Sequence, residues 1–242
     1  MEEEIVLVVG SSGETGKATV ELLAKTNLNK RFILHYSQNK QIVEKLVQTL
    51  HEDQVLMTVQ ADLNDSEQIY SLIDSIPFDV DTIIFTQGQA LSQLLIETKE
   101  QSMDELYNVH VKSTTLITQA LLPAMLKKQY GTIVVVSSIW GEEGASCEVW
   151  YSMMKSAQIN FVKSLAKEIG PSGIRVNGVT PGLIKTKMNH ALTEEELALW
   201  VNEVPLNRVG DVNEVASCIQ FLVSKQASYV NGHILKVNGG IT

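Results

Sequence analysis

Cysteine is scarce in this sequence, because Cys147 and Cys218 are the only two among 242 residues. They form no CxxC pair, and neither is spaced from a histidine as zinc ligands are. The scarcity excludes a disulfide framework and gives no indication of a metal site. It is typical of a protein that works in the reducing environment of the cytoplasm.

Positive charge is also in short supply, since 19 Lys and Arg stand against 28 Asp and Glu, for a formal net charge of −9. No block of basic residues is available to neutralise nucleic acid phosphates, so DNA and RNA are poor partner candidates. No apolar run approaches the ~18 residues of a membrane span. The acidic start, Met1 followed by three glutamates, is unlike a secretory signal, so we expect a soluble cytoplasmic protein with no membrane partner.

Apolar residues, by contrast, are plentiful. They make up 44% of the chain, against 19% charged residues, and a chain of this length can bury about 70–75% of its unfolded surface. No linker rich in Pro, Gly or Ser divides the sequence, and no segment repeats. We therefore predict a single domain over residues 1–242.

Short β-branched runs alternate with longer segments in which apolar residues recur every three or four positions. This alternation predicts an α/β fold, a doubly wound parallel sheet with helices on both faces. The expected strands are Glu4–Val9, Arg31–Tyr36, Gln54–Gln60, Asp81–Thr86, Thr132–Ser137, Gly173–Val179 and Gly232–Val237. The expected helices are Thr15–Lys25, Asn39–Leu50, Ser66–Ser75, Ser102–Lys128, Val149–Ile169 and Asp211–Val223.

Residues 182–210 depart from the alternation. The segment Thr193–Val201 within them has the pattern of a short extra helix. Excursions beyond the strand ends of such sheets usually border the ligand crevice. We therefore expect residues 182–210 to lie on the substrate side.

A glycine-rich turn joins the first predicted strand to the first predicted helix. Glycines allow a close backbone approach, and the free N–H groups at a helix N-terminus favour a pyrophosphate. A plain strand-to-helix turn is the alternative, but the position at the first strand of an alternating chain favours a dinucleotide site. The predicted contacts are Gly10, Ser12, Gly13, Thr15 and Gly16.

The second predicted strand ends without the acidic residue that normally accepts the ribose hydroxyls of NAD. Ser37, Asn39 and Lys40 offer hydroxyl, amide and ammonium donors instead. These donors suit the additional 2′-phosphate of NADPH, so we expect NADPH, with NADH as the less favoured cofactor.

Asp62 and Leu63 follow the third predicted strand. The Asp62 carboxylate could accept a hydrogen bond from the adenine amino group. Equally, it could help to cap the helix that begins near Ser66.

Ser138, Tyr151 and Lys155 form the candidate catalytic group. Tyr151 and Lys155 are four residues apart, so they share one face of a helix. A phenol of pKa ~10 is a poor acid or base near neutrality, but an ammonium beside it stabilises the phenolate. Ser138, at the carboxyl end of a central strand, would hold a substrate carbonyl oxygen.

In this order the motifs resemble the short-chain dehydrogenase/reductase family over essentially the whole chain. That family has a Rossmann-type sheet of about seven strands. The matching residues are Gly10–Gly16, Asp62, Ser138, Tyr151-Ser152-Met153-Met154-Lys155, Arg175-Val176-Asn177, Pro181, Gly182, Ile184, Thr186, Asn231-Gly232 and Val237-Asn238-Gly239-Gly240.

The resemblance implies a role for each matching residue. Tyr151 would protonate a carbonyl oxygen while the nicotinamide delivers hydride, Lys155 would lower the pKa of Tyr151 and bind the nicotinamide ribose, and Ser138 would orient the substrate. Gly88 would belong to the cofactor site. The carboxamide end of the cofactor would be held by Pro181, Gly182, Ile184 and Thr186.

The sequence departs from the family pattern at three places. Glu14 takes the position of the middle glycine, although the dipole of a first helical turn tolerates an acid. Phe85-Thr86-Gln87-Gly88 stands where the family has Asn-Asn-Ala-Gly and keeps only the last glycine. His110 aligns with the asparagine of the catalytic tetrad, and Asn108 falls on the opposite helix face.

We hypothesise that His110 takes the relay position behind Lys155 and adds a group that titrates near pH ~6.5. The alternative is a satisfied structural histidine.

Overall spacing most resembles the 3-oxoacyl-(acyl-carrier-protein) reductases. The segment 139–150, however, resembles the elongation factor P 5-aminopentanone reductases of bacilli, which reduce a ketone carried on a modified lysine. Trp140, Glu143 and Glu148 are the predicted substrate contacts. Together with Glu142, these glutamates would attract an ammonium and repel an acidic carrier protein, unless they simply face solvent.

Three functions therefore stay open. The first is an NADPH-dependent reductase of the aminopentanone on elongation factor P. The second is a 3-oxoacyl-(acyl-carrier-protein) reductase or a general carbonyl reductase. Lys127 and Lys128 keep an acidic carrier protein possible as the partner of this second function. The third is a non-catalytic NADP-binding regulatory protein. The family resemblance also implies a homotetramer.

Overall fold

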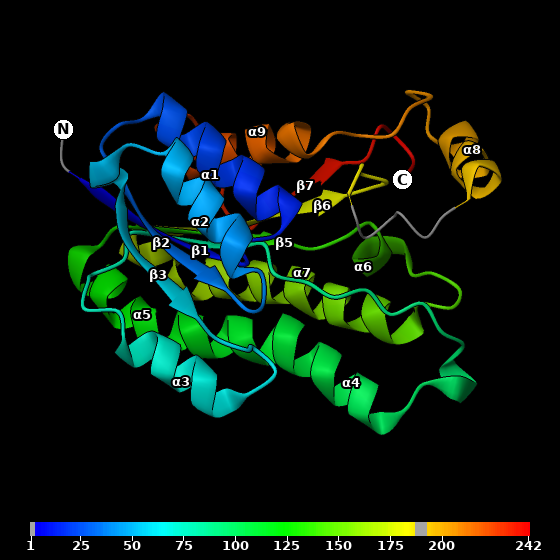
Figure 1. Cartoon of the computed structure of the whole chain (residues 1–242), viewed down its shortest axis with the longest axis horizontal. Helices are drawn as coiled ribbons and strands as arrows, with labels where there is room; N and C mark the ends of the chain where they lie inside the picture. The colour runs from blue at the N-terminus through cyan, green and yellow to red at the C-terminus, as the bar shows by residue number, and fades with distance from the viewer. Residues whose placement is uncertain (1–2, 187–192) are drawn as a thin grey trace.

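Seven parallel strands form one sheet within the described residues, 3–186 and 193–242 of the computed structural model. The strand order is β3-β2-β1-β4-β5-β6-β7 (Figure 1). The predicted α/β fold is therefore confirmed. The strands are β1 Glu4–Val9, β2 Lys30–Tyr36, β3 Val55–Gln60, β4 Thr82–Phe85, β5 Gly131–Val136, β6 Ile174–Pro181 and β7 Ile234–Val237.

The strand order reverses beside β1. The chain adds β2 and β3 on one side of β1, and then returns to place β4 to β7 on the other side. In open parallel sheets a ligand crevice forms outside the carboxyl ends of the strands at such a reversal. Residues that follow β1, β4 and β5 therefore meet at one edge of the sheet.

Helices cover both faces of the sheet (Figure 1). Along β1, Val6 and Val8 pack into one apolar layer, whereas Leu7 and Val9 pack into the other, as the two-residue period of a strand requires. One face carries α1 Glu14–Thr26, α2 Lys40–Thr49 and α9 Val212–Val223. The other carries α3 Ser66–Asp74, α4 Glu100–Tyr107, α5 Ser113–Lys128 and α7 Val149–Ile169.

Burial decreases toward the edges of the sheet. Every residue of β4 and β5 is buried, but β3 is only partly buried along its length. The strand β3 lies at the edge of the sheet and has a neighbour on one side alone. Short 3-10 segments η1 Glu52–Gln54, η2 Leu95–Glu97, η4 Gly170–Ser172 and η6 Lys225–Ala227 complete the connections.

The single helix predicted over Ser102–Lys128 is wrong in one respect. A π-helical segment, η3 Asn108–Lys112, separates α4 from α5. The hydroxyls of Ser113, Thr114 and Thr115 donate to the carbonyls four residues earlier, at 2.6 to 2.9 Å. Such side-chain bonds compete with the backbone ladder and bend helices, which places an irregular turn where α5 begins.

Two short helices lie near the predicted substrate side. The segment 139–150 contains an unpredicted helix, α6 Trp140–Glu143. The helix expected over Thr193–Val201 is α8 Glu194–Glu203, which begins after a capping box formed by Thr193 and Glu196. Positions 187–192 of the predicted excursion lie outside the described residues. No helix in the described part of the chain is both long and apolar enough to span a bilayer.

Candidate active site

Ser138, Tyr151 and Lys155 come together at the carboxyl edge of the sheet. Ser138 follows β5, and its Oγ accepts a hydrogen bond from the backbone N–H of Trp140 at 3.2 Å. The Ser137 hydroxyl donates to the carbonyl of Lys155 at 2.8 Å, which ties α7 to the end of β5. The side chains of Ser138, Tyr151 and Lys155 are nearly enclosed, with exposed fractions of 9%, 8% and 3%.

Burial dominates the acid–base behaviour of this group. It raises the pKa of Tyr151 to about 12, while a hydrogen bond with Ser138 lowers that pKa and the charge of Glu148 raises it. Burial also lowers the pKa of Lys155 to about 7. The Lys155 Nζ lies 5.7 Å from the centre of the Tyr151 ring. The expectation that Lys155 lowers the pKa of Tyr151 is therefore wrong, because burial dominates. Tyr151 is a protonated phenol at neutral pH, beside an amine that titrates in that range.

Lys155 is held by oxygen acceptors. Its Nζ donates to the carbonyl of Val136 and to Gln158 Oε1, each at 3.1 Å. The amide of Gln158 in turn donates to the carbonyl of His110 at 2.9 Å. The sequence analysis did not identify Gln158, because a glutamine three residues after a lysine has no distinctive pattern.

His110 lies in η3, fully buried, with its ring edge-on to Tyr151 at 5.7 Å between centres. Nε2 lies 3.1 Å from the N–H and 3.0 Å from the carbonyl of Gln89, whereas Nδ1 has no partner among the described residues. Burial and then the charge of Lys155 lower the pKa of His110 well below its ordinary value. The expectation that this ring titrates near pH ~6.5 is therefore wrong, and the ring stays neutral.

Asn108 points elsewhere, since its amide donates to the side chain of Asn64 at 3.0 Å.

Gly88 marks the point where the groups from β4, η3 and α7 converge. A Cβ on Gly88 would lie 3.3 Å from His110 Cε1 and 3.7 Å from Lys155 Nζ. Gly88 itself is exposed. Gly88 is therefore an accessible position next to the buried lysine and histidine.

The glycine turn is packed too closely against neighbouring backbone to admit side chains at Gly10 or Gly16. Gly10 has a φ of +86°, and a Cβ there would lie 2.7 Å from the Gln87 nitrogen, while a Cβ on Gly16 would collide with the Gly10 carbonyl. Gly13 is the N-cap of α1 and has no side chain to accept from the first turn. Ser12 and Thr15 are half-buried and Glu14 is exposed. This arrangement fits a pyrophosphate at a helix N-terminus.

His35 fixes this turn in place, a role that sequence analysis missed. Its Nδ1 accepts from the Gly10 N–H at 3.1 Å, and its Nε2 donates to the carbonyl of Ala61 at 3.0 Å. Burial lowers the pKa of His35 to about 4. The neutral ring therefore links the ends of β1, β2 and β3. A histidine inside an otherwise apolar strand is the only sequence feature that could have indicated it.

The residues predicted to hold the adenosine half follow β2. Ser37 is half-buried, Asn39 is the exposed N-cap of α2, and Lys40 is exposed, with its Nζ 3.5 Å from Glu44. Two donors and a cation therefore line the surface next to the glycine turn.

Asp62 accepts from the Asn64 N–H at 3.0 Å. The option that it caps α3 is wrong, because Asp65 is the N-cap and accepts from Glu67 at 2.9 Å. Leu63 is buried in the core, so a ligand could meet only its backbone.

The predicted carboxamide contacts follow β6. Pro181 and Gly182 are half-buried, and Gly182 donates to the carbonyl of Val237 at 3.0 Å. Ile184 is buried and bridges to Gly210, and Thr186 is half-buried at the last described position before the gap.

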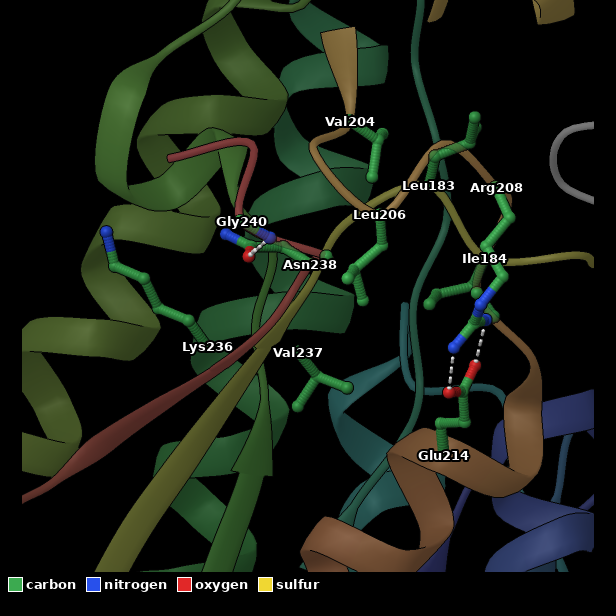
Figure 2. A pocket seen from close by; sticks show the side chains of 12 residues that line it. Leu183, Ile184, Val204, Leu206, Arg208, Glu214, Lys236, Val237, Asn238 and Gly240 are labelled. Atoms are coloured by element: carbon green, nitrogen blue, oxygen red, sulfur yellow. Dashed lines mark hydrogen bonds and ion pairs between the residues drawn. The ribbon is translucent and has the colours of Figure 1, made fainter. Parts of the chain in front are cut away.

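A cavity of about 450 Å³ adjoins this segment, between the ends of β6 and β7 and the start of α9 (Figure 2). Apolar side chains that include Leu183, Val204 and Leu206 line it, and Arg208 forms a two-bond ion pair with Glu214 at its side.

The predicted substrate loop brings aromatic and acidic groups beside Tyr151. Trp140 packs against the cluster that contains Tyr151, and Trp200 of α8 meets Trp140 edge-on at 5.1 Å. Glu148 is half-buried, which raises its pKa, and Glu143 is exposed. Trp200 has no distinctive sequence pattern, since its partner is 60 positions away.

Glu142 is not available to a substrate. Its carboxylate accepts from Thr180 at 2.5 Å and pairs with Lys236 at 3.2 Å. The expectation that three glutamates attract a substrate ammonium is therefore wrong for Glu142. No group of three or more His, Cys, Asp or Glu side chains suited to a metal ion occurs among the residues described.

These features define a class of protein: a doubly wound sheet, a glycine turn after its first strand and a buried Ser-Tyr-Lys group are the fold and site of a dinucleotide-binding oxidoreductase. A protein-family model described as enoyl-(acyl carrier protein) reductase matches residues 13–242.

Curated relatives cover nearly the whole chain. The uncharacterized oxidoreductase YmfI of Bacillus subtilis (strain 168) is 42% identical over 238 residues, which are 97% of this chain and 97% of that protein. The 3-oxoacyl-[acyl-carrier-protein] reductase FabG of Aquifex aeolicus (strain VF5) is 34% identical over 237 residues, 98% of this chain and 86% of that one.

Solved structures have a similar fold over nearly the whole chain. A short chain dehydrogenase/reductase family protein matches with a TM-score of 0.90 and 25% identity, over 99% of this chain and 97% of the other. The 3-oxoacyl-[acyl-carrier protein] reductase from Brucella melitensis ATCC 23457 gives 0.88 and 27%, over 99% and 91%. The chain belongs to the short-chain dehydrogenase/reductase family, which confirms the resemblance found in the sequence, and it is an oxidoreductase of the 3-oxoacyl-(acyl carrier protein) reductase type.

Proposed function

We propose that this protein reduces a ketone to an alcohol, with NADPH as its cofactor and Tyr151 as the proton donor. One observation carries the proposal: Tyr151 is a buried phenol with a pKa of about 12, hydrogen-bonded with Ser138 and beside Lys155. A group with this pKa keeps its proton until a strong base forms next to it, as the oxygen of a reduced ketone is.

In the proposed reaction, the Ser138 hydroxyl holds the carbonyl oxygen and Tyr151 donates its proton to that oxygen. The phenolate left behind is stabilised by the Lys155 ammonium. The neutral His110 ring lies beside Lys155 and edge-on to Tyr151, where it supports the packing of both side chains. His110→Ala is therefore expected to lower turnover, and full turnover of this variant at every pH would contradict a role for His110.

The geometry of the glycine turn supports the binding of a dinucleotide cofactor. A Cβ at Gly10 or Gly16 would collide with the chain's own backbone, so these two glycines allow the tight turn that places the exposed Gly13 at the N-terminus of α1, where free N–H groups favour a pyrophosphate. NADPH supplies the hydride when it is bound. The residues proposed to hold it are Ser12, Thr15, Ser37, Asn39, Lys40, Asp62, the backbone of Leu63, Gly88, Lys155, Pro181, Gly182, Ile184 and Thr186.

The exposed ammonium of Lys40 and the absence of an acidic residue at the end of β2 favour the 2′-phosphate of NADPH over NADH.

We propose the 5-aminopentanone group on elongation factor P as the ketone, which rests on the resemblance of the segment 139–150. The structure adds an electrostatic argument, because Glu148 acts on Tyr151 from a half-buried position and Glu143 is exposed on the same loop. The Trp140–Trp200 pair adds aromatic faces that attract a cation. A small ketone that ends in an ammonium matches these groups.

Reduction of a 3-oxoacyl group on acyl carrier protein is the second candidate, and the names of several relatives favour it. The surface argues against it: Lys128, the basic residue expected to favour an acidic carrier, pairs with Asp81 at 2.9 Å. It also precedes β5, whereas Ser138 follows β5, so the two lie at opposite edges of the sheet.

The test follows NADPH absorbance with purified protein and two substrates in parallel, elongation factor P that bears the aminopentanone and an acetoacetyl thioester. Tyr151→Phe is the control. Oxidation with only the modified factor is the expected result, and oxidation with only the thioester would assign the protein to fatty-acid synthesis. Cofactor binding without turnover of either ketone would support a regulatory NADP-binding protein instead.

We also propose a homotetramer. Large apolar side chains are exposed on the helices α4, α5 and α7, among them Tyr107, Leu126 and Met153, and such surfaces favour association. Light scattering is expected to give the mass of four chains, and a monomeric mass would contradict the proposal.

A further inference from the structure

Gln158 is a buried amide beside Lys155 with no part in the proton transfer described above. It lies on α7, one helical turn after Lys155, and is 2% exposed. Its Nε2 donates to the carbonyl of His110 at 2.9 Å, and its Oε1 accepts from Lys155 Nζ at 3.1 Å. The amide therefore connects the π-helical segment η3 to the buried amine.

The orientation of this amide is fixed by its partners. A backbone carbonyl can only accept, so the NH₂ end of Gln158 must face His110 and the oxygen must face Lys155. The His110 carbonyl also accepts from the Thr114 hydroxyl at 2.9 Å. Turning the amide over would place two donors together at Lys155 and two acceptors together at His110, at a cost for buried groups.

Lys155 has three N–H donors when it is charged. The carbonyl of Val136 and Gln158 Oε1 accept from Lys155 Nζ, which leaves one N–H for the crevice. Two fixed acceptors determine the direction of this third N–H. Oxygen acceptors also favour the charged form of an amine, against the burial that favours the neutral form.

We propose that Gln158 is a positioning residue, which holds the Lys155 ammonium to the carbonyl of His110 and directs its third N–H toward Tyr151. The inference rests on the proposed function, because it serves the stabilisation of the Tyr151 phenolate by Lys155. Without Gln158, Lys155 would lose its charge at a lower pH.

The other titratable groups around Lys155 leave it as the group that changes charge near neutrality. His110 faces it from η3 and stays neutral, because its pKa is well below the ordinary value. Tyr151 faces it from α7 and keeps its proton. Glu148, at the start of α7, acts on Tyr151 and is partly exposed.

The test is a titration of Lys155 by NMR in the full-length, cofactor-free protein with ¹³C-labelled lysine, in which Lys155→Met identifies the resonance. Gln158→Leu removes the acceptor and is expected to lower the Lys155 pKa by about one unit. Gln158→Glu places a carboxylate there and is expected to raise it by about one unit or more. In the NADPH-saturated enzyme, the alkaline limb of kcat/KM is expected to move in the same two directions.

Gln54→Leu is the matched control. Gln54 is also a buried glutamine, 3% exposed, and its Nε2 donates to the carbonyl of Ala24 at 3.0 Å. It lies in η1 at the amino end of β3, away from the site. This variant is expected to lose stability while the Lys155 titration stays unchanged.

An unchanged titration in both Gln158 variants, or shifts of the same sign in both, would overturn the proposal. If Gln158→Leu does not fold, Gln158→Asn replaces it, since a side chain one methylene shorter cannot reach both partners. Opposite shifts without turnover of any ketone would uphold the position of Gln158 and refute the proposed function instead.

Discussion

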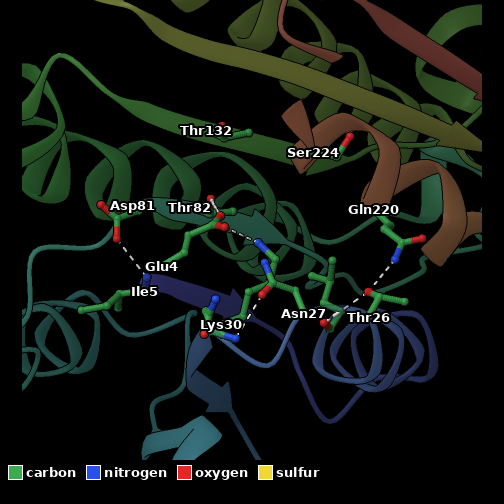
Figure 3. A network of polar contacts seen from close by, with 12 residues as sticks. Glu4, Ile5, Thr26, Asn27, Lys30, Asp81, Thr82, Thr132, Gln220 and Ser224 are labelled. Atoms are coloured by element: carbon green, nitrogen blue, oxygen red, sulfur yellow. Dashed lines mark hydrogen bonds and ion pairs between the residues drawn. The ribbon is translucent and has the colours of Figure 1, made fainter. Parts of the chain in front are cut away.

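At the amino edge of the sheet, the carboxylate of Glu4 accepts from Lys30 at 2.5 Å and from the Thr82 hydroxyl at 2.8 Å, whereas at the carboxyl edge Nδ1 of His110 has no partner among the described residues. Figure 3 shows the polar network at the amino edge, in which Asp81 also accepts from the N–H of Ile5 at 2.9 Å. There, each of these charges meets an opposite charge or a donor.

The carboxyl edge keeps its polar groups incompletely paired. The Gln87 Oε1 is buried without a partner among the described residues, and Lys155 and Tyr151 are enclosed with their pKa values moved by burial. Such groups cost stability, yet Lys155 and Tyr151 are the ones among them that can exchange protons with a ligand. The difference indicates that the amino edge stabilises the fold and the carboxyl edge carries the chemistry.

The sharpest test of this division compares two tyrosines. Tyr151→Phe is expected to lower ketone reduction about 10³-fold, within the range for removal of a general acid, with little change in the melting temperature. Tyr130→Phe makes the same change at the amino edge, where Glu4 and Asp81 act on the phenol, and is expected to keep full turnover. NADPH oxidation measures the turnover of both variants and thermal unfolding measures their stability. Equal turnover in the two variants would refute the assignment of the chemistry to the carboxyl edge.

His35 couples the carboxyl edge to stability through pH. Its folded-state pKa of about 4 lies below the ordinary 6.5, so between these values the unfolded chain binds a proton that the folded protein does not. The free energy of unfolding is therefore expected to fall by about 3 kcal/mol as the pH drops from 6.5 to 4. Protonation of Nδ1 would also break its bond with Gly10.

Denaturant unfolding at several pH values measures this loss in the wild type and in His35→Gln. The variant has no group that titrates at position 35, so its curve is expected to be flatter by the same amount. Parallel curves would show that the acid sensitivity comes from the carboxylates.

The strands and the catalytic trio could be predicted because local sequence determines them. The apolar runs placed β1 at its observed ends, and the four-residue spacing of Tyr151 and Lys155 determined their common face. Position along the chain then placed Ser138 nearby, because strands of a parallel sheet end at the same edge.

The features that were missed depend on hydrogen bonds that the apolar pattern does not reveal. The π-helical segment needs the hydroxyls of Ser113, Thr114 and Thr115 to bond backward, which helical periodicity does not reveal. His35 depends on Ala61, and Gln158 on His110. A lone polar residue in an apolar segment gives no indication of which distant group it meets.

Substitutions at the amino edge are expected to lower stability and leave turnover unchanged, which is the converse of the result expected for Tyr151→Phe. Lys30→Met leaves the Glu4 carboxylate, which is 18% exposed, without its cation, and is expected to lower the free energy of unfolding by about 2 kcal/mol with turnover unchanged. Lys40→Met removes an exposed pair with Glu44 and is expected to cost about 0.5 kcal/mol or less. Chemical denaturation measures both, and equal losses would refute a special role for the amino edge.

A smaller effect than that of Lys30→Met is expected from the acidic group beside Tyr151. Glu148→Gln removes the charge without changing the shape, so KM for an ammonium-bearing ketone is expected to rise about tenfold, or about 1.4 kcal/mol, while KM for a neutral ketone of equal length stays constant. The charge of Glu148 raises the pKa of Tyr151, so its removal is also expected to lower that pKa slightly. Equal increases in KM for the two ketones would mean that Glu148 shapes the loop and does not recognise a cation, and the carboxyl edge would then select substrates by its aromatic pair alone.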